Sequence, residues 1–185
     1  MPSVRRSLVL CVAVSAVWVG GATGADGPIA TFAGTVVGFA GDGEPATQAL
    51  LNQPEGMAVG ADGSVLIADA RNHRIRRVAP SGIITTVVGG GDGTGPANGF
   101  GGDGGPAFDA LLDTPTDVAF RADGSYVIAD SGNHRIRRVA PNGVITTIAG
   151  IGLGLAGDGG PAVAARLNTP RELAPMPDGA LLVAD

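Results

Sequence analysis

Residues 116–150 read TDVAFRADGSYVIADSGNHRIRRVAPNGVITTIAG, and this stretch decides the fold. Short runs rich in β-branched and aromatic residues alternate with Asp-Gly, Ser-Gly and Pro-Asn-Gly, which is the pattern of strands joined by turns. A four-stranded meander of this kind has apolar side chains on both faces, so it needs similar sheets on either side. We expect strands at 118–120, 126–129, 135–139 and 144–149, with a polar corner at 130–134.

The same pattern recurs through the chain. Asp69 and His73 recur 61 residues later as Asp130 and His134, and Asp103 recurs 55 residues later as Asp158. A repeat of a few tens of residues that holds four strands is typical of a β-propeller blade. The sequence therefore predicts an all-β fold, a propeller of four-stranded blades of which about two and a half are present.

The repeats place the blades at 54–89, 115–150 and, cut short, 170–185. Residues 28–34 match the fourth strand of a blade, and we expect them to be an outer strand lent to another blade. Propellers have at least about four blades, so we expect this chain to be the N-terminal part of a longer, incomplete ring. If the chain truly stops at Asp185, an uncovered sheet edge predicts self-association.

Residues 1–24 have the order of a secretory signal peptide. Arg5 and Arg6 precede an apolar run at 8–19, and small residues follow at 20–24. We expect cleavage there and a secreted, periplasmic or cell-surface protein with no membrane span after cleavage. An uncleaved signal anchor is the alternative, although the run is short for a span.

Charge and cysteine content exclude some classes of function. The chain has 12 basic residues, all arginine, against 17 acidic ones, and the net charge is −5. Loss of residues 1–24 would remove two arginines and the single cysteine. A nucleic-acid partner needs a basic surface, so the sequence predicts none. It also predicts no disulfide and no thiolate metal site in the mature chain.

The connections between blades share a Gly-Asp-Gly core at Asp42, Asp103 and Asp158. We expect a turn, one helical turn begun by proline, and then entry to the inner strand. Loops of this composition suggest calcium or another divalent metal as an alternative, but each offers one carboxylate, or two in the first copy. We expect the aspartates to cap backbone amides of their own loops, and no cofactor.

In an up-and-down sheet, the corners between the second and third strands lie at the same end as the crossings into the next blade. Variable loops gather at that end, so it is the expected binding face. The recurring histidines suggest a metal ligand or general base, yet a residue present in every blade favours a structural role. The sequence predicts no catalytic or metal-binding residues. The candidate ligand-binding residues are Asp69, Arg71, Asn72, His73, Phe100, Asp130, Asn133 and His134.

Two of these candidates depart from the repeat. Residues 90–100 account for six extra residues in the second crossing, and we expect this flexible insertion to expose Phe100. Arg71 stands where the next copy has Gly132. The arginines at 74–77 and 135–138 resemble a basic patch, but their repetition beside aspartates predicts ion pairs between strands and blades.

The segments DSGNHRIRRV at 130–139 and ARNHRIRRV at 70–78 resemble the NHL repeat, with isoleucine in place of the leucine. The surrounding GDGGPA and ITTIAG motifs resemble the version found in exported bacterial proteins and in teneurin-like proteins. The resemblance implies a propeller, usually six-bladed, that acts most often as a binding scaffold. We therefore expect an exported scaffold for a protein or glycan partner. The alternative is a metal-dependent lyase or lactonase-like hydrolase whose active residues lie in other blades.

Overall fold

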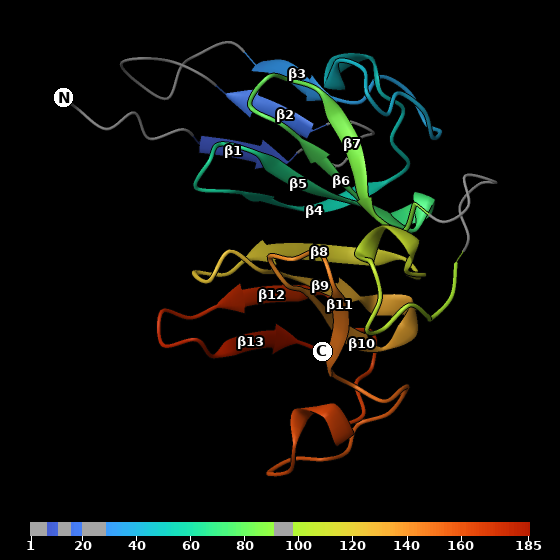
Figure 1. The fold of residues 1–185 in the computed structure, drawn as a ribbon, viewed down its shortest axis with the longest axis vertical. Helices are drawn as coiled ribbons and strands as arrows, with labels where there is room; N and C mark the ends of the chain where they lie inside the picture. The colour runs from blue at the N-terminus through green and yellow to red at the C-terminus, as the bar shows by residue number, and fades with distance from the viewer. Residues whose placement is uncertain (1–6, 11–15, 20–28, 91–97) are drawn as a thin grey trace.

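The computed structural model describes residues 7–10, 16–19, 29–90 and 98–185. Antiparallel sheets are stacked one after another along the long axis of the molecule (Figure 1). Two of them have four strands in meander order, which we call the first and second blades. The first blade holds β4 (Pro54–Val59), β5 (Val65–Asp69), β6 (Arg74–Val78) and β7 (Ile84–Val88), and the second holds β8 (Pro115–Phe120), β9 (Tyr126–Asp130), β10 (Arg135–Val139) and β11 (Ile145–Ala149).

The third repeat contributes a two-stranded sheet of β12 (Glu172–Pro175) and β13 (Leu181–Ala184). The predicted all-β fold of four-stranded blades, two complete and one partial, is confirmed. The inner strand of the second blade begins earlier than predicted, because Pro115 pairs with Asp130 at the end of β9. The pattern of β-branched residues missed this start because proline and aspartate are poor strand formers.

A further sheet holds β1 (Ser7–Leu10), β2 (Ala16–Val19) and β3 (Ile29–Ala33). β1 and β2 lie within the predicted signal peptide, whose other residues lie outside the described ones, and the signal peptide stays a prediction. After β3, the amide of Gly34 donates to the carbonyl of Ala46 at 3.0 Å. Gly150 donates in the same way to Ala162 after β11, so β3 stands to the first blade as a fourth strand stands to the next blade.

The crossings into each sheet contain the predicted single helical turn. The turns are 3-10 helices, η1 (Ala46–Gln48), η3 (Ala107–Asp109) and η5 (Ala162–Ala164), and each follows a proline. The corners contain similar turns, η2 (Ala70–Asn72) and η4 (Ser131–Asn133). The amide of Arg71 in η2 donates to Asn52 of the crossing at 3.0 Å, so corners and crossings lie at the same end, as expected.

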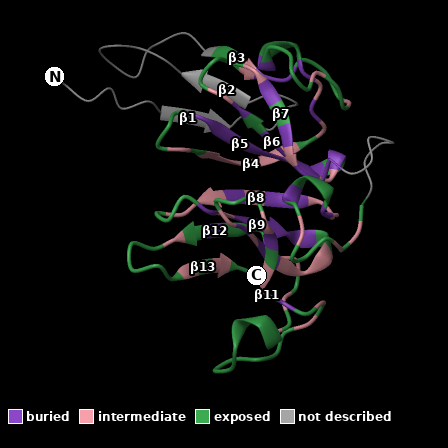
Figure 2. Ribbon diagram, viewed as in Figure 1, coloured by how far each residue is buried: buried purple, intermediate pink, exposed green. Residues whose placement is uncertain are grey.

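The core lies between the sheets. Ile128 of β9 packs with Leu66 of β5 in the cluster between the first two blades. Its neighbour Val127 packs with Leu173 of β12 in the cluster on the other side. Buried residues accordingly concentrate in the middle strands of the stack, while the last sheet is largely exposed (Figure 2). Among the described residues, no helix is long and apolar enough to cross a membrane.

Candidate functional site

We call the end of the molecule that carries the crossings and corners the loop face. It comprises the crossings at 34–52, 98–113 and 150–168 and the corners at 69–73 and 130–134. All eight predicted site residues belong to this face. The structure therefore brings them to one end of the stack, but at very different depths.

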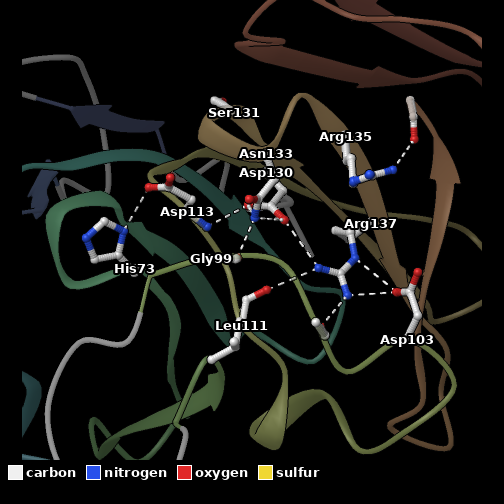
Figure 3. Close-up of polar contacts among 12 residues, drawn as sticks. His73, Gly99, Asp103, Leu111, Asp113, Asp130, Ser131, Asn133, Arg135 and Arg137 are labelled. Carbon is white, nitrogen blue, oxygen red and sulfur yellow. Dashed lines mark hydrogen bonds and ion pairs between the residues drawn. The ribbon is translucent and has the colours of Figure 1, made fainter. Parts of the chain in front are cut away.

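In the second blade, Asp130 is the centre of a buried polar network (Figure 3). Its carboxylate accepts hydrogen bonds from the amide of Asp113 at 2.8 Å, from Asn133 Nδ2 at 2.9 Å and from Arg137 Nη1 at 3.2 Å. Arg137, also buried, donates from Nη2 to Asp103 at 2.7 Å. One guanidinium thus ties the corner, the third strand and the crossing together.

The first blade repeats this network. Asp69 accepts from the amide of Asn52 at 2.7 Å and from Asn72 Nδ2 at 2.8 Å. Arg76 lies 3.5 Å from the Asp69 carboxylate and donates to Asp42 at 2.8 Å. The predicted ion pairs of the third strand are therefore present.

The prediction that the loop aspartates cap their own loops is wrong for Asp42 and Asp103. Asp42 accepts from Arg76, and Asp103 from Arg137, both across 34 residues of sequence. The reason is that a buried guanidinium needs a carboxylate partner, whereas loop amides at the surface can bond to water.

Burial raises the pKa of Asp69 to about 6, and that of Asp130 also to about 6. The hydrogen bonds from the neighbouring amides, asparagines and arginines lower both pKa values, but burial outweighs them. The donors hold the ionised carboxylates at neutral pH. These carboxylates therefore shape the loop face from beneath, together with the buried Asn72.

The histidines connect neighbouring sheets. His73 of the first blade accepts a hydrogen bond at Nδ1 from the amide of Thr114, 3.0 Å away at the entry to the second blade. His134 accepts in the same way from Thr169, 3.0 Å away at the entry to the third sheet. Both histidines have left-handed backbone conformations, with φ of 54° and 56°. The Nδ1 atom of each ring is thus occupied by a backbone amide, which favours the structural role.

Aromatic rings lie on the loop face above these networks. Phe100 has the guanidinium of Arg135 at 4.0 Å from its ring centroid, and Phe39 has that of Arg74 at 3.7 Å. Both rings remain partly exposed, at 45% and 37%. Each ring is therefore held by a cation on one side and is open to solvent elsewhere.

Phe100 is a repeat residue. It lies 61 positions after Phe39, the same interval that relates the other residues of the two blades, so it does not belong to the six extra residues. Of the predicted flexible insertion, residues 91–97 lie outside the described ones. Sequence reasoning missed Phe39, although the 61-residue interval would have found it.

The third crossing has Leu155 at the equivalent position, and it is 77% exposed. Other large apolar side chains are exposed around these three positions. They are Val36 and Val37 in the first crossing and Ile151 and Leu153 in the third. We call Phe39, Phe100 and Leu155 with these four residues the apolar row.

The remaining predicted residues have polar contacts at the surface or just below it. Arg71 is exposed, and its Nε donates to Gln53 Oε1 at 3.0 Å. Asn133 also donates to the carbonyl of Gly99 at 2.6 Å, as Asn72 does to Gly38 at 2.7 Å. These bonds fix the loops that carry the aromatic rings. Within the described residues, no group of three or more His, Cys, Asp or Glu side chains could hold a metal ion.

Comparison with protein families identifies the repeats. Residues 37–98 match the Teneurin NHL domain, and residues 112–139 match the NHL repeat. Human teneurin-4 is 39% identical over 105 residues, which cover 52% of this chain and 4% of teneurin-4. The chain thus spans a small fraction of the curated relatives that it matches.

Solved structures share the fold. A protein of unknown function from Bacteroides thetaiotaomicron has a TM-score of 0.70 at 15% identity, over 96% of this chain and 41% of that chain. A streptogramin B lyase has a TM-score of 0.53 at 14% identity, over 92% of this chain and 41% of that chain. At these identities the likeness concerns the fold alone.

Proposed function

This chain is an NHL-repeat protein of the β-propeller fold, and we propose that it is a binding scaffold whose loop face takes a protein partner. The observation that carries the proposal is the apolar row, in which successive repeats present Phe39, Phe100 and Leu155 to solvent. Repetition of an exposed large apolar residue, at a position where each blade could carry a polar one, favours a contact surface.

The arginines beneath the rings supply rigidity. Arg74 stacks on Phe39 and Arg135 on Phe100, so each ring keeps one orientation before a partner arrives. A side chain that is already ordered loses less conformational entropy on binding. The buried networks of Asp69 and Asp130 hold the loops in place from below.

The aliphatic members of the apolar row favour a protein over a glycan. Val36, Val37 and Leu155 have no ring to stack on a sugar, but they can be buried against apolar side chains. The net charge of −5 opposes nucleic acid. We further propose that the protein acts outside the cytoplasm after removal of residues 1–24, as the order of charged, apolar and small residues there predicts.

The lyase or lactonase-like alternative has no support among the described residues. The streptogramin B lyase shares the fold with this chain, and fold alone does not assign an activity. The histidines of the two described blades accept backbone amides, as structural residues do.

Peptide-display selection on the full chain, alongside a glycan array, tests the binding proposal. We expect selected peptides to bind the loop face, and the double variant Phe39→Ala/Phe100→Ala to weaken them by about tenfold or more, as loss of an aromatic anchor does. Phe108→Ala is the matched control, because Phe108 is also an exposed phenylalanine but has no arginine stacked on it among the described residues.

Selected binders that ignore the double variant, or that lose affinity equally with Phe108→Ala, would contradict the proposal. Glycans that bind where peptides do not would move the partner to the other class. Sequencing the N-terminus of the exported product tests the location, since an intact Met1 would exclude cleavage.

A further inference from the structure

A groove lies at the opposite end of the molecule, between the first and second blades. It is formed where the tight turns at 60–64, 121–125 and 140–143 meet, and it has a volume of about 530 Å³. A second hollow of about 490 Å³ adjoins it and shares Tyr126 and Val139 as lining residues. We call the first of these the turn-end groove. Its volume lies within the range of small-molecule sites, about 300–1,000 Å³.

The turn-end groove is lined by side chains that break the repeat. Phe120, Arg121 and Tyr126 of the second blade all line it. The residues at the equivalent positions, 61 earlier and 55 later, are Val59 and Pro175, Gly60 and Met176, and Val65 and Leu181. Both other copies fill these positions with small or aliphatic residues. The blade architecture therefore does not require an aromatic pair and a cation here.

The walls of the groove are apolar and include flat surfaces. Phe120 and Tyr126 meet edge to face, with ring centroids 6.1 Å apart and an interplanar angle of 70°. Leu66, Val87 and Val139 complete the apolar lining. Such walls suit a ligand with a ring or a compact hydrocarbon body.

Three polar groups stand in this apolar lining. The hydroxyl of Tyr126 makes no hydrogen bond among the described residues. Burial raises the pKa of Tyr126 to about 12, so the hydroxyl keeps its proton and can donate. The guanidinium of Arg121 donates at 2.7 Å to the carbonyl of Gly179 and pairs with no carboxylate in the described part of the chain. Arg77 pairs with Asp62 at 2.7 Å.

We propose that the turn-end groove binds a small organic anion that has an apolar, ring-containing body and a carboxylate. The body packs between the Phe120 and Tyr126 rings and the aliphatic wall. The carboxylate accepts hydrogen bonds from Arg121 and from the Tyr126 hydroxyl, and Arg77 adds positive charge. An anionic ligand is favoured over a cationic one because two arginines and a single aspartate line the groove.

This site is independent of the loop face, which lies at the other end of the blades. A partner on the apolar row and a small anion in the turn-end groove would contact different turns of the same two sheets. Failure of one proposal therefore leaves the other intact.

Binding of 3-phenylpropionate to the full chain, followed by NMR of backbone amides, tests the proposal. We expect saturable shifts of amides in the turns at 121–125 and 140–143. The uncharged 3-phenylpropanamide has the same body without the charge, and we expect it to bind about tenfold more weakly, because hydrogen bonds to a charged group contribute more.

The repeats themselves supply the variants. Arg121→Met and Tyr126→Leu introduce the residues that the third copy carries at Met176 and Leu181, so the blade fold accommodates them. Each should weaken 3-phenylpropionate by about tenfold, and Tyr126→Phe should weaken it less, because it removes the hydroxyl alone. Arg138→Met is the control, since Arg138 is an arginine of the same blade outside the groove lining.

The proposal is overturned if no saturable shift occurs at the turns, if the amide binds as well as the carboxylate, or if Arg138→Met weakens binding as much as Arg121→Met. Shifts confined to the loop face, around Phe39 and Phe100, would also overturn it.

Discussion

Neighbouring arginines of one strand have very different environments in this protein. Arg137 of β10 is fully buried and bonds to Asp130 and Asp103, whereas Arg138 lies nearer the surface and pairs with Asp123 at 2.8 Å. The alternation of a strand turns their side chains to opposite faces of the sheet. Burial makes the first pair costly to break, and solvent makes the second pair nearly neutral.

Arg137→Met should lower the free energy of unfolding by about 3–5 kcal/mol, because it leaves the Asp130 carboxylate buried without its cation. Arg138→Met, one residue along, should lower it by no more than about 1 kcal/mol. Urea unfolding of the two variants at pH 7 measures both values. Equal losses would show that the buried network does not support the blade.

The His73 contact predicts a pH dependence. Burial lowers the pKa of His73 below its usual value of 6.5, with Arg71 and Arg74 acting in the same direction and Asp113 opposing. The unfolded chain therefore takes up the proton first as the pH falls. The stability contributed by neutral His73 is fully present above about pH 6.5 and is lost as the pH falls toward its lower pKa in the folded protein.

NMR titration of the His73 ring should give a pKa below 6.5, and the Thr114 amide should shift over the same range. His73→Asn keeps a residue that tolerates the left-handed conformation but removes the ring. Its unfolding free energy should fall less than that of the wild type between pH 7 and pH 5.5. A pKa above 6.5 would mean that Asp113 prevails over burial.

At the scale of the elements, the two ends of each blade are built differently. The tight turns at one end bond mainly within themselves, as when Asp123 accepts from the amide of Ser125 at 3.0 Å. The crossings at the other end bond to the next blade, as when the amide of Gly150 donates to Ala162 at 3.1 Å. A change in a tight turn should therefore stay local, while a change in a crossing should disturb two blades.

Two glycines test this difference. Gly143 in a tight turn has φ of 82° and open space where a Cβ atom would lie, so Gly143→Ala should cost only the left-handed strain, about 1–2 kcal/mol. Gly150 in a crossing has φ of 88°, and a Cβ there would overlap the carbonyl oxygen of His134. Gly150→Ala should cost about 3 kcal/mol.

Thermal unfolding of the two alanine variants gives the comparison. Equal costs would mean that the crossing relaxes freely and does not clamp the blades together.

At the scale of the whole molecule, stability comes from sheets packed in series. Each interior sheet has two apolar faces, and adjacent residues of its second strand serve different neighbours. Ile128 faces the first blade, and Val127 faces the third sheet. The stack therefore behaves as a repeat protein, in which each interface contributes its own term.

Ile128→Ala should weaken the contact between the first two blades by about 2–5 kcal/mol and speed amide exchange in β5 and β6. Val127→Ala should instead speed exchange in β12, because its cluster contains Leu173. Hydrogen exchange read by mass spectrometry separates the two effects. The same exchange pattern from both variants would show that the three sheets open as one unit.

Much of this protein follows from its sequence alone. Turn residues such as those at 123–124 and 141–143 and the period-two strands between them have local causes, and the interval of 61 residues between His73 and His134 makes the stacking of blades predictable. The common location of the corners and crossings follows as well, since a meander must place them at one end.

The tertiary structure alone decided which polar groups meet. Asp42 and Asp103 looked like caps of their own loops, and only the fold brings them to Arg76 and Arg137, 34 residues away. His73 reaches Thr114 across a blade boundary in the same way. The physical reason is that local signals set backbone conformation, whereas the partner of a buried charge is chosen by whatever carboxylate the packing leaves within reach. The turn-end groove has the same origin, because its walls belong to two blades.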